Sequence, residues 1–137
     1  MRTSTGPSTE EVTEWARKLY ADGVDKRDAD IFADGFVRDG WLRFGNNPPL
    51  VGQEAIRTGI AQFFTMMAGV EHESAGTYYV DGTLILEAKV TYTLHQGGTV
   101  SVHAVTIFKI ADSGPPRAEN CRIYVDLTPL FSAVQPI

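Results

Sequence analysis

The sequence has a single cysteine, Cys121, so its 137 residues can form no intrachain disulfide and no cysteine-rich metal site. It also lacks any apolar run that approaches the roughly 20 residues a membrane-spanning helix needs. The N-terminal stretch MRTSTGPST has no apolar segment of the kind found in signal peptides. We therefore expect a reducing, cytoplasmic setting and no membrane partner.

Basic residues are in the minority, with 12 Lys and Arg against 17 Asp and Glu and a net charge of −5. A chain with this balance has no basic field to gather phosphates, so we expect no nucleic-acid partner. Glycine-rich phosphate loops and nucleophile elbows are missing as well. The histidines, His72, His95 and His103, lack a shared metal-ligand spacing. The sequence therefore predicts neither a metal nor a cofactor.

What the chain does contain is ordinary for a globular protein, with 43% hydrophobic residues and aromatic residues spread along its length. A chain of this size can bury most of its apolar surface in one core. No repeat, low-complexity tract or interior linker divides it. We therefore expect a single domain over residues 1–137.

The first half of the chain carries helical patterns. Ser8 and Glu11 have the spacing of a capping box, and apolar residues follow at helical intervals, which predicts a helix over about 8–24. A short second helix is expected from Ala29. A strand over 37–44 and an irregular Asn-Pro loop come next. Residues 52–67 place apolar side chains on one face of a third helix.

The second half of the chain carries β patterns. A strand over about 70–80 is followed by Asp81-Gly82, a strong hairpin dipeptide. Residues 84–94 alternate between apolar and polar side chains, and a Gly-Gly turn at 97–98 leads into a second alternating strand. A loop follows, and CRIYVDL is the expected last strand. This order predicts an α+β fold in which three N-terminal helices pack on a curved, mostly antiparallel sheet.

Three stretches of the sequence resemble one family. FGNNPPLVGQEAIRTGIAQFF, VTYTLHQGGTV and RIYVDLTPLF look like SnoaL-like proteins of the NTF2-like superfamily, and the resemblance covers about residues 10–133. It implies a cone-shaped fold around a small-molecule pocket. Relatives include polyketide cyclases, limonene epoxide hydrolase, ketosteroid isomerase and dehydratases, so the fold does not by itself fix the reaction.

The resemblance to the cyclases points to Asp126 as a general acid and base, because their catalytic aspartate lies at this position of the last strand. A carboxylate that faces an apolar cavity is poorly solvated, which raises its pKa toward the range useful for proton transfer. Two structural alternatives are that Asp126 caps a strand end or pairs with Arg122. Those two residues are four apart, so a strand places both on one face.

The resemblance to two other relatives is incomplete at their catalytic positions. Asn46 matches the water-positioning asparagine of the epoxide hydrolase, and Tyr20 matches the oxyanion-binding tyrosine of the isomerase. Phe44 stands where the isomerase has its general base, and Thr106 where it has a second aspartate. The arginine and second aspartate of the hydrolase are replaced as well, the latter by Tyr92. We therefore expect neither reaction by its known route.

These considerations predict a cofactor-free acid/base enzyme of cyclase, isomerase or lyase type that acts on a hydrophobic, oxygenated metabolite. The alternative is a non-catalytic small-molecule-binding or dimeric interaction module. A homodimer is expected from the mixed apolar and hydroxyl outer face of the long strands. The predicted catalytic residues are Asp126, Tyr20 and Asn46. The predicted ligand-binding residues are Phe44, Phe64, Tyr92, Thr106, Phe108, Arg122, Tyr124 and His72.

Overall fold

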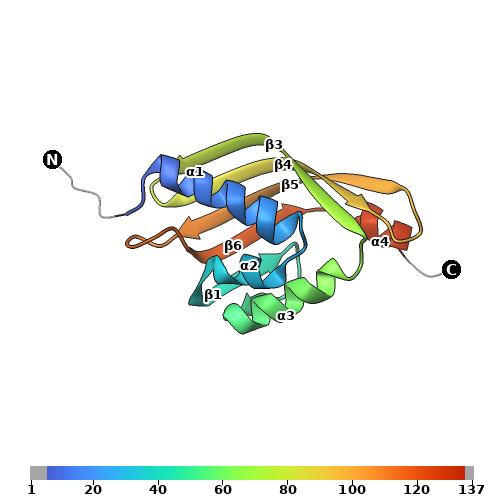
Figure 1. The fold of residues 1–137 in the computed structure, drawn as a ribbon, viewed down its shortest axis with the longest axis horizontal. Helices are drawn as coiled ribbons and strands as arrows, with labels where there is room; N and C mark the ends of the chain where they lie inside the picture. Colours follow the sequence, from blue (N-terminus) through green and yellow to red (C-terminus); the bar gives the residue numbers. More distant parts are fainter. Residues whose placement is uncertain (1–5, 135–137) are drawn as a thin grey trace.

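The computed structural model describes residues 6–134 and shows helices packed against one curved, six-stranded sheet (Figure 1). The ends of the predicted domain, residues 1–5 and 135–137, lie outside the described residues. The helices are α1 (Thr9–Lys18), the π-helix η1 (Leu19–Val24), α2 (Ala29–Asp34), α3 (Gln53–Phe64) and α4 (Thr128–Val134). The strands are β1 (Phe36–Phe44), β2 (Leu50–Val51), β3 (Gly69–Val80), β4 (Thr83–Thr93), β5 (Thr99–Ile110) and β6 (Ala118–Val125).

The sheet has the strand order β2-β1-β6-β5-β4-β3. All neighbouring strands are antiparallel except β1 and β6, which run parallel. The α+β fold with N-terminal helices on a mostly antiparallel sheet is thus confirmed. In Figure 1, α1 lies along β3, β4 and β5, whereas α2 and α3 lie toward β1.

Alternation along the strands decides which side chains face the helices. In β4 and β5 the even-numbered residues are the buried ones, and cross-strand pairs such as Leu84 with Phe108 put them on one face. The helices contribute the opposite layer of the core, which includes Val12, Ile56 and Ile60. The period-2 pattern of the sequence therefore predicted the buried face of the two longest strands correctly.

The first helix begins as predicted and ends differently. Ser8 and Glu11 form the expected capping box, with the Glu11 backbone N–H donating to the Ser8 hydroxyl. The predicted span of about 8–24 is divided, because α-helical bonding stops at Lys18 and the last turn is a π-helix. In this turn the Asp25 N–H donates to the carbonyl of Tyr20, five residues earlier, at 2.8 Å.

The predicted hairpin turns are present. Asp81 and Gly82 both have positive φ angles, 50° and 76°, as a two-residue turn between twisted strands requires. Two elements were not predicted: the two-residue strand β2 and the C-terminal helix α4. The last strand also starts earlier and ends at Val125, two residues before the predicted end, because the chain turns there into α4.

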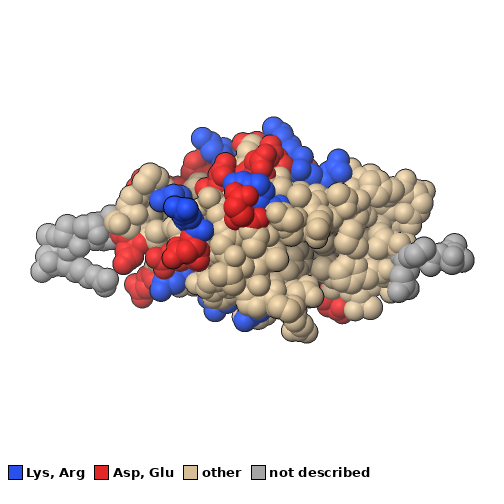
Figure 2. Space-filling view, turned by 90° about the horizontal axis from the view of Figure 1, so that it is seen from below, with Lys and Arg blue, Asp and Glu red and all other residues tan. Residues whose placement is uncertain are grey.

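The charged side chains are mixed on the face that Figure 2 shows. Acidic and basic residues alternate over its left part and upper rim, and the right part toward α4 is almost free of charge. No helix within residues 6–134 is long and apolar enough to cross a membrane.

Candidate functional site

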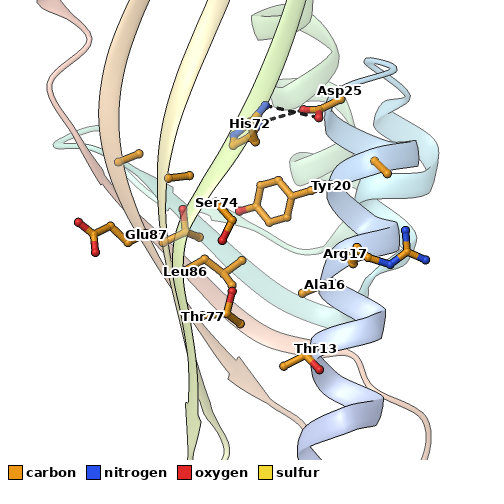
Figure 3. A pocket seen from close by; sticks show the side chains of 14 residues that line it. Thr13, Ala16, Arg17, Tyr20, Asp25, His72, Ser74, Thr77, Leu86 and Glu87 are labelled. Atoms are coloured by element: carbon orange, nitrogen blue, oxygen red, sulfur yellow. Dashed lines mark hydrogen bonds and ion pairs between the residues drawn. The ribbon is translucent and has the colours of Figure 1, made fainter.

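A cavity of about 500 Å³ lies between the first helical layer and the concave side of β3, β4 and β5 (Figure 3). We call it the outer cavity. Much of its wall consists of small or apolar side chains from both layers, and hydroxyl groups are added by Thr13, Ser74 and Thr77. The remaining lining residues are Ala16, Arg17, Tyr20, Ala21, Asp25, His72, Leu86, Glu87, Ala88, Ala104 and Thr106.

Two charged residues of this lining turn their charges away from the cavity. In Figure 3 the guanidinium of Arg17 and the carboxylate of Glu87 both point outward, so mainly their stems form the wall. Arg17 is bound to Glu14 on the surface of α1, at 2.6 Å. The ionisable groups left at the inner end of the cavity are therefore His72, Asp25 and the Tyr20 phenol.

His72 and Asp25 form a hydrogen-bonded pair at this inner end. The distance from His72 Nδ1 to Asp25 Oδ1 is 2.9 Å, and the His72 backbone N–H also donates to Oδ2 at 3.4 Å. Both side chains are mostly buried, with exposed fractions of 19% and 27%. The carboxylate thus accepts two hydrogen bonds from one residue, which fixes the imidazole in its orientation.

The π-helix brings Asp25 to this position. Because η1 widens the last turn, Tyr20 faces the cavity from its first turn and Asp25 caps its C-terminal end. Gly23 allows η1 to pack tightly, since a Cβ there would lie 3.0 Å from the backbone nitrogen of Phe32. Single turns of π-helix are often found at functional sites.

Tyr20 stands beside the pair, with its ring centroid 4.8 Å from that of His72. Burial raises the pKa of its phenol far above the usual value, although an interaction with the Thr106 hydroxyl acts in the opposite direction. The phenol therefore stays protonated at physiological pH. It can donate a hydrogen bond to an oxygen atom of a ligand.

The pair has the chemistry of a general base. An ionised carboxylate only accepts hydrogen bonds, so Asp25 favours the tautomer with the proton on His72 Nδ1, in which Nε2 of the neutral ring carries the lone pair. No residue within 6–134 makes a hydrogen bond to Nε2. Asp25 orients the ring and stabilises the imidazolium that forms when Nε2 takes a proton.

A second, smaller cavity of about 50 Å³ lies on the other side of Tyr20, inside the cone. We call it the inner cavity. Tyr20, His72, Ala104 and Thr106 line both cavities, so the His72–Asp25 pair lies at their junction. The other walls are Val24, Phe32, Phe44, Ile60, Phe63, Phe64, Val70, Val90, Tyr92, Ile123 and Val125.

Six of the predicted site residues lie on these cavities. Tyr20, His72 and Thr106 line both of them, and Phe44, Phe64 and Tyr92 line the inner one. Aromatic packing explains why the inner cavity is small: the ring of Phe63 lies 4.8 Å from that of Phe44 and 6.0 Å from that of Tyr92.

Asp126 lines neither cavity and is exposed, which corrects the prediction of a buried proton carrier. Its side chain is exposed and accepts a hydrogen bond from the Thr128 N–H at 3.0 Å, at the start of α4. Hydrogen bonds from the side chain and backbone of Thr128 lower its pKa, the opposite of the predicted direction. The residue also forms no ion pair with Arg122; its contact is the one to the α4 turn.

Four other predicted residues line neither cavity. Asn46 is exposed in the loop after β1. Phe108 is fully buried in the core, where its ring packs edge-on against that of Trp15. Arg122 and Tyr124 face the outer side of the sheet, because they pair with Ile107 and Val105 rather than with inward residues.

Sequence analysis missed Asp25, which directly follows the first predicted helix. An aspartate one residue after a helix is normally interpreted as marking the helix end. Nothing in the sequence connects Asp25 to His72, which is 47 positions away. His72, which was predicted, lies on the same face of the sheet as its β4 partner Val90, and both residues line the inner cavity.

Burial raises the pKa of the Cys121 thiol well above its usual range, so this cysteine is a poor nucleophile. Within the part of the chain that the structure describes, no three His, Cys, Asp or Glu side chains gather into a group that could hold a metal ion.

The family model of the SnoaL-like domain matches residues 16–114. No curated protein matches the sequence. Among solved structures, the chain is similar to a candidate SnoaL-like polyketide cyclase from Jannaschia sp. CCS1, with a TM-score of 0.80, 18% identity and 99% of each chain covered.

Two further structures are similar in fold. An NTF2-like protein of unknown function from Burkholderia pseudomallei K96243 has a TM-score of 0.79 and 11% identity, with 92% of this chain and 98% of that chain covered. TerC, co-crystallised with polyporic acid, has a TM-score of 0.75 and 16% identity, with 92% and 99% covered. At these identities the likeness shows a shared fold.

Proposed function

The chain belongs to the SnoaL-like family, and from this premise we propose that it is a cofactor-free acid/base enzyme that acts on a hydrophobic, oxygenated small molecule. The observation that carries the proposal is the His72–Asp25 pair at the inner end of the outer cavity, with a 2.9 Å hydrogen bond. This pair takes the proton-carrying role that the sequence suggested for Asp126.

The outer cavity supports this choice of substrate. Its volume of about 500 Å³ is within the range of pockets that hold drug-sized ligands, roughly 300–1,000 Å³. Alanine and leucine side chains favour an apolar body, and the hydroxyl groups of Thr13 on α1 and of Ser74 and Thr77 on β3 suit oxygen substituents of the ligand. The charged ends of Arg17 and Glu87 point away, which favours an uncharged substrate.

The proposed reaction begins with proton removal from a carbon next to a carbonyl group. His72 Nε2 takes this proton, and Asp25 stabilises the imidazolium through Nδ1. The Tyr20 phenol, which stays protonated, donates a hydrogen bond to the enolate oxygen that develops. Return of the proton to another atom gives an isomer, and attack of the enolate carbon on a second carbonyl group gives ring closure. Both outcomes need only this acid/base machinery.

The proposal is tested by hydrogen–deuterium exchange at acidic carbons. A panel of uncharged cyclic ketones, from two to four fused rings, is incubated with the protein in D₂O and followed by NMR. We expect exchange of at least one ketone to be faster with the protein than in buffer. His72→Gln should lower that rate by about 10²–10⁴-fold, which is typical when a general base is lost.

Two variants make this test specific. Asp25→Asn keeps the shape of the pair and removes the charge that stabilises the imidazolium, so it should lower the rate as well. Asp126→Asn lies outside both cavities and should leave the rate unchanged. Tight binding of a ketone without any exchange would support the non-catalytic binding module instead.

We also propose that the protein forms a homodimer through the outer face of β4, β5 and β6. Tyr124, 47% exposed, lies on this face with Asn120 and Arg122. A second copy seated on this face would cover the tyrosine. Light scattering should show a dimer at micromolar concentration, and Val105→Asp should convert it to a monomer.

A further inference from the structure

The turn that joins η1 to α2 contains a residue in a strained backbone conformation. Arg27 has a φ angle of 54°, in the left-handed region that residues other than glycine rarely adopt. Among the non-glycine residues of 6–134, only Asp81 shares a positive φ, and the tight hairpin turn after β3 requires it there. No hairpin encloses Arg27, which lies between two helices. Strain of this kind persists only where surrounding contacts hold it.

The side chain of Arg27 makes such a contact. Its Nη1 donates a hydrogen bond to the backbone carbonyl of Met67 at 3.0 Å, 40 positions further along the chain. Met67 is fully buried and lies two residues before β3 begins at Gly69. Within the described part of the chain, the guanidinium forms no ion pair that competes with this bond. A charged donor makes the bond stronger than one between two neutral groups.

The two ends of this contact lie close in sequence to the two members of the His72–Asp25 pair. Asp25 precedes Arg27 by two residues, and His72 follows Met67 by five. The described residues join the end of η1 and its following turn to the chain entering β3 by hydrogen bonds at two places: within the pair, and from Arg27 to the Met67 carbonyl. The turn that carries Asp25 is therefore fastened to the start of β3 at a second point.

We propose that Arg27 is a positioning residue, which keeps Asp25 within hydrogen-bond distance of His72 by fastening the turn to the start of β3. The proposal rests on the proposed function where it gives the pair a role in proton transfer. Arg27 lines neither cavity, so it acts through the pair and does not touch the substrate. Without this fastening, the carboxylate depends on its own two bonds, and the one from the His72 backbone N–H is long, at 3.4 Å.

The variant Arg27→Gly separates positioning from overall stability. Loss of the bond to Met67 destabilises the fold, whereas glycine relieves the left-handed strain, so the melting temperature should change by only a few degrees. Asp81→Gly is the matched control, because it relieves the same kind of strain in the hairpin turn and leaves the Met67 contact intact. The melting temperature of this control should be equal to or above that of the wild type.

Amide hydrogen exchange and ¹⁵N NMR measure the pair directly. In Arg27→Gly the His72 amide proton should exchange faster, because Asp25 is its acceptor, and the tautomer with the proton on Nδ1 should be less populated. The Ala68 amide, which is hydrogen-bonded to β4 at 2.8 Å, should keep its exchange rate. Both His72 readouts should stay at wild-type values in Asp81→Gly. If His72 is unchanged in Arg27→Gly, or if Ala68 loosens as much as His72 does, the positioning role is wrong.

Turnover separates this proposal from the proposed function. With a ketone that the wild type exchanges, Arg27→Gly should lower kcat by up to about 10²-fold while KM changes little, because a misplaced catalytic group slows the chemical step and the cavity wall is unaltered. A loosened His72 with kcat at the wild-type value would refute the role of Arg27 in catalysis. If the wild type exchanges no ketone, the proposed function fails, and the NMR readouts still decide whether Arg27 positions the pair.

Discussion

Replacing Gly23 by alanine tests whether the π-helix holds the His72–Asp25 pair in place. A Cβ at this position would lie 3.0 Å from the backbone nitrogen and 3.2 Å from the Cα of Phe32. Backbone atoms cannot rotate away, so η1 and α2 must separate for the methyl group to fit. Because Asp25 directly follows η1, this movement displaces the carboxylate from His72 Nδ1.

The expected loss of stability follows from two opposing effects. Overpacking in a filled core costs about 1–3 kcal/mol. Alanine regains about 1 kcal/mol over glycine in a helix interior. The net loss in the free energy of unfolding is therefore up to about 2 kcal/mol, which lowers the melting temperature of a chain of this length by several degrees.

Urea unfolding measures the stability, and ¹⁵N NMR of the histidines measures the state of His72. In the wild type, the neutral His72 ring should carry its proton on Nδ1, where Asp25 accepts it. In Gly23→Ala, this tautomer should be less populated. Gly59→Ala on α3 is the control, since its Cβ would meet only the flexible side chain of Leu50, at 2.6 Å. If Gly23→Ala is as stable as the wild type and keeps the Nδ1 tautomer, the positioning role of the π-helix is wrong.

Three further predictions concern other parts of the molecule. Asp126→Asn should lower the melting temperature at pH 7. The pKa of Asp126 is lowered in the folded state, so its carboxylate stabilises the fold at any pH above the ordinary pKa of aspartate. The difference in melting temperature should vanish as the pH falls through the lowered pKa. The melting temperature should decline from about pH 10 upward, because the phenols of the unfolded chain ionise there while those of Tyr20 and Tyr92 in the folded chain stay protonated. Tyr92→Phe should make this decline shallower. Leu42→Ala removes a fully buried side chain and should cost about 2–5 kcal/mol in urea unfolding; a loss below 1 kcal/mol would show that this part of the core is loosely packed.

The sequence predicts most of the fold because its local signals agree with the tertiary structure. The capping box at Ser8 and the alternation in β4 and β5 each follow from short-range geometry. The π-helix was not predictable in this way, since helical periodicity looks nearly the same whether the last turn is α or π. Gly23 in this turn packs closely against the backbone of Phe32, a tertiary contact that the sequence does not reveal.

The candidate site was harder to predict, and Asp126 shows why. Cys121, Ile123 and Val125 face the core, so the alternating pattern places Asp126 on the outer side with Arg122 and Tyr124. The resemblance to the cyclases points the opposite way, toward the pocket. Asp25, by contrast, reaches His72 only through the packing of η1 against β3, which a single sequence does not reveal.

The central claim is that the His72–Asp25 pair, and not Asp126, is the reaction centre. A crystal structure of the protein with a bound ketone from the exchange panel tests it most directly. We predict that the ligand lies in the outer cavity, with an oxygen or its acidic carbon next to His72 Nε2. A ligand bound at Asp126 on the outer side of the sheet, or one that occupies the cavity without approaching His72, would contradict the claim.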